Sequence, residues 1–125
     1  MEGPMNQRTH ILLAGIAGAT AVIAGAMMAH RVPNYPGSPQ SVAVLYHMFH
    51  ALALLGVAAL AARNGTKALT ASAWCFAIGI LLFSGGIYLR AIFGPSFPGA
   101  TVPVGGMAFI AGWLALVWHA LSRAE

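Results

Sequence analysis

Residues 42–62, VAVLYHMFHALALLGVAALAA, contain no Asp, Glu, Lys or Arg. The stretch is about 20 residues long, and a helix of that length rises about 30 Å, the thickness of a bilayer's hydrocarbon core. A strand is excluded because the run is too long and lacks alternation of apolar and polar residues. Backbone N–H and C=O groups in lipid need partners within their own segment, so the stretch predicts a transmembrane helix.

The same pattern recurs elsewhere in the chain, which is 59% hydrophobic and 6% charged. Three further uncharged stretches of spanning length are residues 11–29, 69–89 and 102–121. They leave no room for a sizeable water-soluble domain. The chain is therefore predicted to be a single all-α transmembrane domain, residues 1–125, folded as an antiparallel bundle. Its four helices are predicted at about 10–30, 41–62, 67–90 and 103–122.

Turn-forming residues separate these stretches. Residues 31–40 (RVPNYPGSPQ) hold three prolines, and residues 63–67 (RNGTK) contain an Asn-Gly pair followed by Thr66, a candidate helix N-cap. Residues 91–101 are rich in glycine and proline and carry no charge. Pro103 falls near the first turn of the last helix, where its missing N–H costs little.

Basic residues near the helix ends indicate the orientation in the inner (plasma) membrane. Four lie on one predicted side and two on the other: Arg8, Arg63, Lys67 and Arg123 against Arg31 and Arg90. The positive-inside rule then places both termini in the cytoplasm. A cleaved signal peptide ending near Ala24-Gly25-Ala26 is an alternative, disfavoured because the apolar run continues past that triplet.

Small residues recur at helical spacing and predict close helix packing. Ala14/Gly18, Gly15/Ala19 and Ala21/Gly25 lie four residues apart in the first helix, Gly79 and Gly86 belong to the third, and the last carries a stripe of Gly105, Ala108, Gly112 and Ala115. We expect these faces mainly to build the bundle. The alternative is a face for self-association or for another subunit.

Polar residues gather near the side opposite the termini. His47 and His50 lie one turn apart, and the helices that end on that side contribute the rest of a predicted polar cluster. The predicted cluster consists of His30, His47, His50, Tyr88 and Arg90.

Several uses of this cluster are open. A haem could take His50 and His30 as ligands, a divalent metal could take these two with His47, and a quinone or lipid headgroup could be held by His and Arg. The favoured interpretation is that neutral histidines hydrogen-bond across helices, since no acid or cysteine completes a metal site. The sequence does not single out a cofactor. His10 and His119, at the other helix ends, are expected to reach toward the interface.

Known catalytic patterns are absent from the sequence. The two acids, Glu2 and Glu125, lie in the terminal tails, so they cannot form an acid–base pair within the membrane. Ser84 lacks a nucleophile-elbow context, and Cys75 is the single cysteine. The chain is therefore not expected to be an enzyme. Its scattered basic residues also make nucleic acid an unexpected partner.

Four motifs in order resemble the small bacterial inner-membrane family known as domain of unknown function 423, whose eukaryotic relatives are the transmembrane protein 256 group. They cover most of the chain: GAMMAH (25–30), YHMFHALALLG (46–56), LLFSGGIYLRA (81–91) and TVPVGGMAFIAGW (101–113). The resemblance implies four membrane helices and supplies no activity. The chain resembles the family at His30, His50, Ser84, Tyr88 and the Thr101-Pro103-Gly105-Gly106 turn. This resemblance favours His30, His50 and Tyr88 as the site residues over a metal site that needs His47.

Two functions follow as hypotheses. The first is a non-enzymatic accessory or assembly component of a membrane complex, with membrane lipids and other subunits or a second copy as partners. The alternative is a membrane protein that binds haem, quinone or lipid at the polar cluster. Transport is a weaker idea, because four short helices leave little room for a pathway within a monomer.

Overall fold

The computed structural model describes residues 4–31 and 35–123, and these ranges contain helices and no strand. The elements are α1 (Gln7–Arg31), α2 (Pro39–Asn64), α3 (Lys67–Gly79), a π-helix η1 (Ile80–Ser84), α4 (Gly85–Phe93) and α5 (Thr101–Ser122). Because α3, η1 and α4 follow one another without a break, there are four helical rods, each long and apolar enough to span a membrane. The predicted all-α, four-span fold is confirmed.

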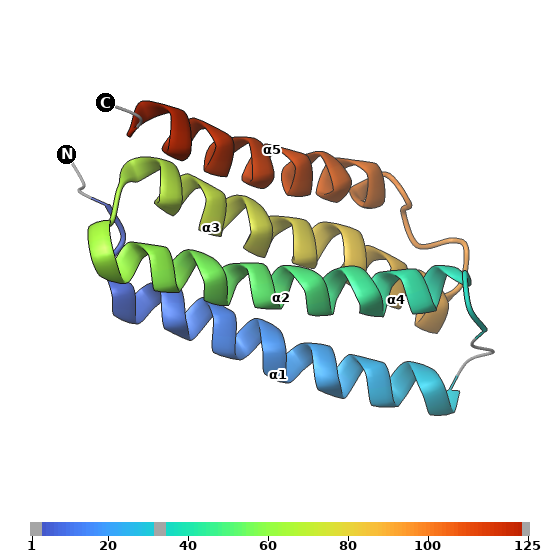
Figure 1. Ribbon diagram of the computed structural model, residues 1–125. Helices are drawn as coiled ribbons and strands as arrows, with labels where there is room; N and C mark the ends of the chain where they lie inside the picture. The colour runs from blue at the N-terminus through green and yellow to red at the C-terminus, as the bar shows by residue number, and fades with distance from the viewer. Residues whose placement is uncertain (1–3, 32–34, 124–125) are drawn as a thin grey trace.

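The rods form an antiparallel bundle with both chain ends at the same end of the molecule (Figure 1). α1 packs mainly along α2, and α5 packs mainly on α3 and η1. α2 also contacts α3, η1 and α4, so it holds the two halves of the bundle together. Cytoplasmic placement of the two termini remains a prediction.

Local signals explain where two helices begin. The Ser38 hydroxyl accepts a hydrogen bond from the backbone N–H of Ser41, and Pro39 follows in the first turn of α2. Thr66 accepts from the N–H of Leu69 at the start of α3, which confirms the predicted N-cap. Thr66 also lies 2.9 Å from His119 Nδ1, so the cap ties the start of α3 to the end of α5.

Glycines let α5 approach α3 and η1 closely. A Cβ at Gly79 or Gly112 would collide with the ring of Phe109 or Phe76, respectively. A Cβ at Gly105 would lie 2.3 Å from the backbone nitrogen of Phe83. These glycines of the third and fourth rods therefore build the bundle, as predicted, in the way small residues pack membrane helices.

The predicted third helix contains an irregular turn that the sequence analysis missed. The N–H of Gly85 donates to the carbonyl of Ile80, five residues earlier, which is the π-helical pattern. Ser84, at the end of η1, is fully buried, and its hydroxyl donates to the carbonyl of Ala43 at 2.7 Å. The widened turn thus fastens the third rod to α2.

Candidate functional site

His47 joins three rods through a chain of hydrogen bonds. Its Nδ1 lies 3.0 Å from the hydroxyl of Tyr88 on α4, and its Nε2 lies 3.1 Å from the hydroxyl of Thr20 on α1. The Thr20 hydroxyl also lies 2.8 Å from the carbonyl of Ile16. A hydroxyl has one proton to donate, and the Ile16 carbonyl can only accept it. Thr20 therefore accepts from His47 Nε2–H, and His47 Nδ1 accepts from Tyr88.

His50 forms a second, separate link. Its Nδ1–H donates to the Tyr46 carbonyl at 2.7 Å, and its Nε2 accepts from the indole N–H of Trp113 on α5 at 3.1 Å. The ring stacks on Phe109 with centroids 3.7 Å apart and also contacts Phe76 on α3. Both nitrogens of a neutral His50 imidazole are thus hydrogen-bonded, one as donor and one as acceptor. The bond to Trp113 connects α2 with α5.

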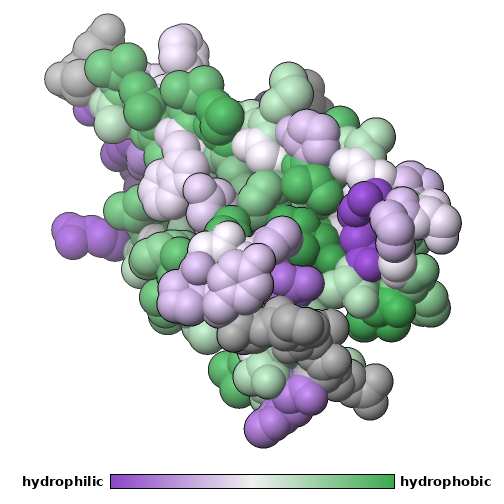
Figure 2. Space-filling view, turned by 90° about the vertical axis from the view of Figure 1, so that its right-hand side faces the viewer, coloured by the Kyte–Doolittle hydropathy of each residue, from purple (hydrophilic) through white to green (hydrophobic). Residues whose placement is uncertain are grey.

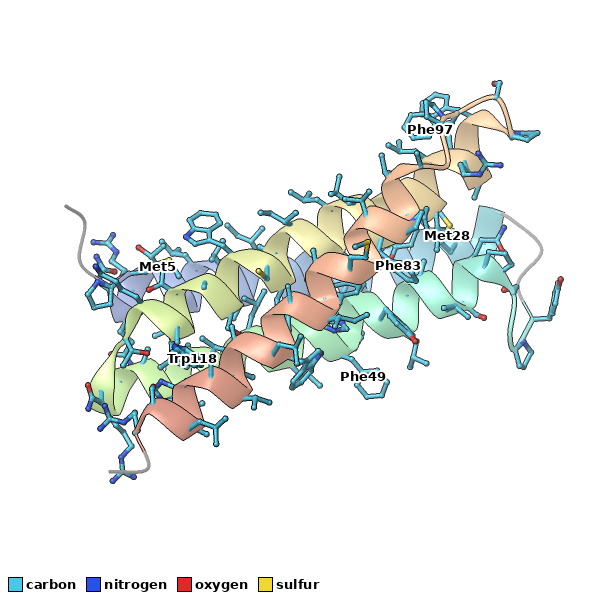
Figure 3. The ribbon with its side chains drawn as sticks, turned by 90° about the horizontal axis from the view of Figure 1, so that it is seen from above. Met5, Met28, Phe49, Phe83, Phe97 and Trp118 are labelled. Atoms are coloured by element: carbon cyan, nitrogen blue, oxygen red, sulfur yellow. The ribbon has the colours of Figure 1, made fainter. Side chains whose placement is uncertain are left out.

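The five residues predicted as one cluster are dispersed in the structure. His47 and Tyr88 lie together, whereas His50 faces α5. The guanidinium of Arg90 donates to the Phe97 carbonyl in the loop after α4, and Figure 3 shows Phe97 at that end of the bundle. His30 is exposed at the end of α1. Ligand binding by any of the five remains a prediction.

Two participants were missed by the sequence analysis. Thr20 is a polar residue within an apolar run, and Trp113 carries an indole N–H that needs a partner when buried. These features could have marked both as hydrogen-bonding partners. Their partners could not be named, because the bonded residues are 27 and 63 positions apart in sequence.

His10 departs from expectation. Its side chain is fully buried, so the prediction that it reaches toward the interface is wrong. Neither ring nitrogen has a hydrogen-bond partner among the described residues. The N-terminal segment covers this end of the bundle, where the N–H of Met5 donates to the hydroxyl of Thr70 at 2.7 Å.

The geometry does not fit a haem held by His50 and His30. His50 has no free ring nitrogen, since Tyr46 and Trp113 occupy both. His30 is exposed at the end of α1, and no described contact joins it to His50. In residues 4–31 and 35–123, no three His, Cys, Asp or Glu side chains are placed to hold a metal ion.

A groove of about 270 Å³ opens between α1 and the third rod, beside the His47 link. Thr20, His47 and Tyr88 are its polar lining residues, and the rest of its lining is Gly85 and apolar side chains. Thr20, Ile80 and Leu81 also line an adjoining apolar groove of about 190 Å³. The two together form a mostly apolar channel along the membrane face with one polar region.

Comparison with known proteins gives a consistent family. Residues 24–106 match the family model described as "Protein of unknown function (DUF423)". The chain is 37% identical to "UPF0382 membrane protein YwdK" of Bacillus subtilis (strain 168) over 115 residues, 88% of this chain and 94% of the relative. It is 31% identical to "UPF0382 inner membrane protein YgdD" of Escherichia coli (strain K12) over 121 residues, 94% of this chain and 92% of the relative.

No solved structure matches the chain significantly. The named relatives are membrane proteins, one of them of the inner membrane, which agrees with the four apolar rods and the predicted location. The match to the family model covers more than half of the chain, and the relatives align over most of both lengths. The chain therefore belongs to the DUF423 family and is a multi-pass inner-membrane protein.

Proposed function

We propose that the protein is a non-enzymatic accessory or assembly component of a membrane complex, which it joins by packing a partner's transmembrane helix against α1 and α2. The observation that carries the proposal is a notch of about 220 Å³ between these two helices. Gly15 and Gly18 lie in it, and a Cβ added at either would meet nothing within 4 Å. At glycines inside the bundle, such as Gly79 and Gly112, neighbouring residues occupy the space that a Cβ would need.

The chemistry of the notch suits a helix from another subunit or from a second copy. Ala14 and Ala51 complete a floor of small residues, and larger apolar side chains, Ile11, Met48, Leu52 and Leu55, form its rim. Helices in lipid associate where small residues let their backbones approach, because apolar contact alone gains little over contact with lipid tails. A floor of small residues, bordered by a rim of larger ones, provides such a surface.

The interior supports a structural role over a catalytic one. His47 and His50 are held by hydrogen bonds within the chain, and the buried hydroxyls of Ser72 and Ser84 donate to the carbonyls of Gly112 and Ala43. These groups stabilise the bundle by connecting its helices. The sequence has no carboxylate side chain other than those of Glu2 and Glu125 to act as a base within the membrane.

Filling the notch is expected to abolish assembly while leaving the fold intact. In Gly15→Leu/Gly18→Leu, the new side chains occupy space that is empty in the monomer, and leucine favours helix over glycine. The tagged protein, extracted in mild detergent, is measured by native mass spectrometry. We expect wild type to retain a partner at fixed stoichiometry. In the double variant, the amount of bound partner should fall by at least about 90%, which corresponds to a loss of about 1.4 kcal/mol in binding free energy.

Gly56→Leu is the matched control. Gly56 also has open space at its Cβ position, but it lies on α2 outside the notch. This variant should retain the partner. The mass of the complex distinguishes a second copy from another subunit. A wild-type protein recovered as a lone monomer, or a double variant that keeps its partner, would contradict the proposal.

A second candidate function is lipid or quinone binding in the groove beside His47. The specific observation is the mostly apolar channel that meets Thr20, His47 and Tyr88. Apolar pockets with a few polar groups are typical of small-molecule sites. An isoprenoid or acyl tail would lie along the channel, and its polar end would exchange hydrogen bonds with Tyr88 or His47.

This second function predicts a co-extracted ligand. Leu81 lines both parts of the channel and is 72% exposed, so Leu81→Trp should fill the channel without disturbing the core. Organic extraction and mass spectrometry of purified protein should find a lipid or quinone at near-equal molar ratio in wild type and several-fold less in the variant. An equal amount in both proteins would reject the channel as its site.

A further inference from the structure

A pocket separate from the histidine links lies at the end of the bundle where α2 begins and α4 ends, which we call the loop end. Its volume is about 560 Å³, and it is bounded by the start of α2, by α4, by the following loop and by the start of α5. Gln40 and Arg90 supply its polar side chains. Figure 2 looks onto this end and shows a hollow with green apolar atoms on its floor and purple hydrophilic atoms beside it.

Arg90 is held in place by the loop that follows α4. Its guanidinium donates to the carbonyl of Phe97 and lies across Gly99, where a Cβ would be 2.9 Å from a terminal nitrogen of the arginine. A side chain at position 99 would require the guanidinium to shift. Among the described residues Phe97 is the acceptor found, so most of the guanidinium N–H donors remain available to a ligand in the pocket.

The charge around the pocket is unbalanced. Residues 4–31 and 35–123 include no Asp or Glu, and the first and last of these residues lie at the opposite end of the bundle (Figure 1). Arg90 therefore has no carboxylate to pair with at the loop end of the described structure. A cation without a counterion among the described residues favours an anion from outside the chain.

The start of α5 adds to this preference. Ala100 occupies the N-cap position and forms no side-chain cap, and residues of the first turn, Val102 and Pro103, line the pocket. The N–H of Val102 donates to the carbonyl of Gly99 and Pro103 has no N–H, so the partial positive charge at this end comes from the helix dipole. The dipole and the guanidinium therefore act on the same pocket.

We propose that this pocket binds a phosphate group, with Arg90 as the charged partner and the Gln40 amide as a second donor. The guanidinium fork matches phosphate oxygens in geometry and charge. Arg90 lies near the end of the Lys67–Phe93 span, at the depth where phospholipid headgroups meet a membrane protein. A lipid phosphodiester and free phosphate share this chemistry, and the experiment separates them.

The test compares wild type with Arg90→Gln in two arms. In the first, protein in nanodiscs of phosphatidylcholine mixed with phosphatidylglycerol is released, and native mass spectrometry counts the phosphatidylglycerol retained. In the second, inorganic phosphate is titrated calorimetrically into protein in neutral detergent. Because Arg90→Gln loses the charge-assisted hydrogen bonds, it is expected to bind phosphatidylglycerol or inorganic phosphate about tenfold more weakly than wild type.

Controls separate the pocket from general charge and from misfolding. Arg63→Gln removes an exposed arginine at the other end of α2 and should bind as wild type does. Gln40→Leu leaves Arg90 in place and should weaken binding by a smaller factor. Helicity and thermal unfolding should be unchanged in all three variants.

The results of the two arms support or overturn the phosphate site as follows. Lipid retention lost in Arg90→Gln supports a headgroup site, and phosphate binding lost in the second arm supports a free-phosphate site. Equal binding by wild type and Arg90→Gln with both probes, or no binding by wild type, would overturn the proposal. An equal loss in Arg63→Gln would show only nonspecific attraction to basic residues, and would also overturn it.

Discussion

Gly105→Ala is expected to destabilise the bundle by about 3 kcal/mol, the upper end of the usual cost of overpacking a core. The added Cβ would lie 2.3 Å from the backbone nitrogen of Phe83 and 2.8 Å from the carbonyl carbon of Leu82. These are backbone atoms, so relief requires α5 to move away from η1. The free energy of unfolding in mixed micelles of mild detergent and dodecyl sulfate measures the loss.

The neighbouring glycine provides the matched control. A Cβ at Gly106 would approach no atom closer than Phe83 Cδ2 at 3.8 Å, which is an ordinary contact. Gly106→Ala is therefore expected to be neutral or to stabilise slightly, by up to about 1 kcal/mol, because alanine favours helix. Equal stabilities for the two variants would show that α5 does not approach η1 as the structure places it.

His50→Leu is expected to lower the free energy of unfolding by about 1 to 3 kcal/mol. The substitution introduces an apolar side chain of similar size, leaves the Trp113 N–H without its acceptor and removes the stacking on Phe109. The hydrogen bond of a partly buried donor contributes about 0.5 to 1.5 kcal/mol, and the ring pair about 0.5 to 1.5 kcal/mol. Unfolding in mixed micelles, compared with wild type, measures the loss.

A double-mutant cycle identifies the cause. Trp113→Phe removes the donor, so the combined variant should lose less than the sum of the two single losses, by about 1 kcal/mol. His30→Leu, at an exposed position, should change stability by less than about 0.5 kcal/mol. Additive losses, or a His50→Leu protein as stable as wild type, would reject the structural link.

The four spans could be predicted because lipid leaves the backbone few choices. Residues 42–62 must satisfy their own hydrogen bonds in the membrane, and α2 (Pro39–Asn64) contains them all. Thr66 was found as a cap because capping depends on residues three positions apart in sequence. These features are local, so the sequence displays them.

The partners of the histidines could not be predicted in the same way. His47 and His50 lie three residues apart, about 60° around a helix axis, and this difference turns one toward α1 and α4 and the other toward α5. Which neighbour each meets depends on the rotation of every helix, which packing at glycines such as Gly105 determines. The sequence indicated a polar cluster, whereas the structure contains separate links.

The role of the glycines with empty space at the Cβ position could not be predicted from the sequence either. Gly15 and Gly18 have the spacing and composition of residues that pack inside the bundle, as Gly79 and Gly112 do. Only the structure distinguishes them, because no neighbour fills the space above the first pair. That distinction changes them from bundle-forming residues into the proposed contact surface.

Cysteine labelling in intact cells tests most directly that the chain crosses the membrane four times with both termini in the cytoplasm. Cys75→Ala removes the single cysteine, and one new cysteine at a time is placed at an exposed position of each end, Tyr35→Cys or Ser96→Cys at the loop end and Asn64→Cys or Ser122→Cys at the other. A membrane-impermeant maleimide should label Tyr35→Cys and Ser96→Cys in intact cells, and Asn64→Cys and Ser122→Cys only after permeabilisation. Labelling of one residue from each pair in intact cells would contradict the four-span layout, and labelling of Asn64→Cys and Ser122→Cys alone would reverse its orientation.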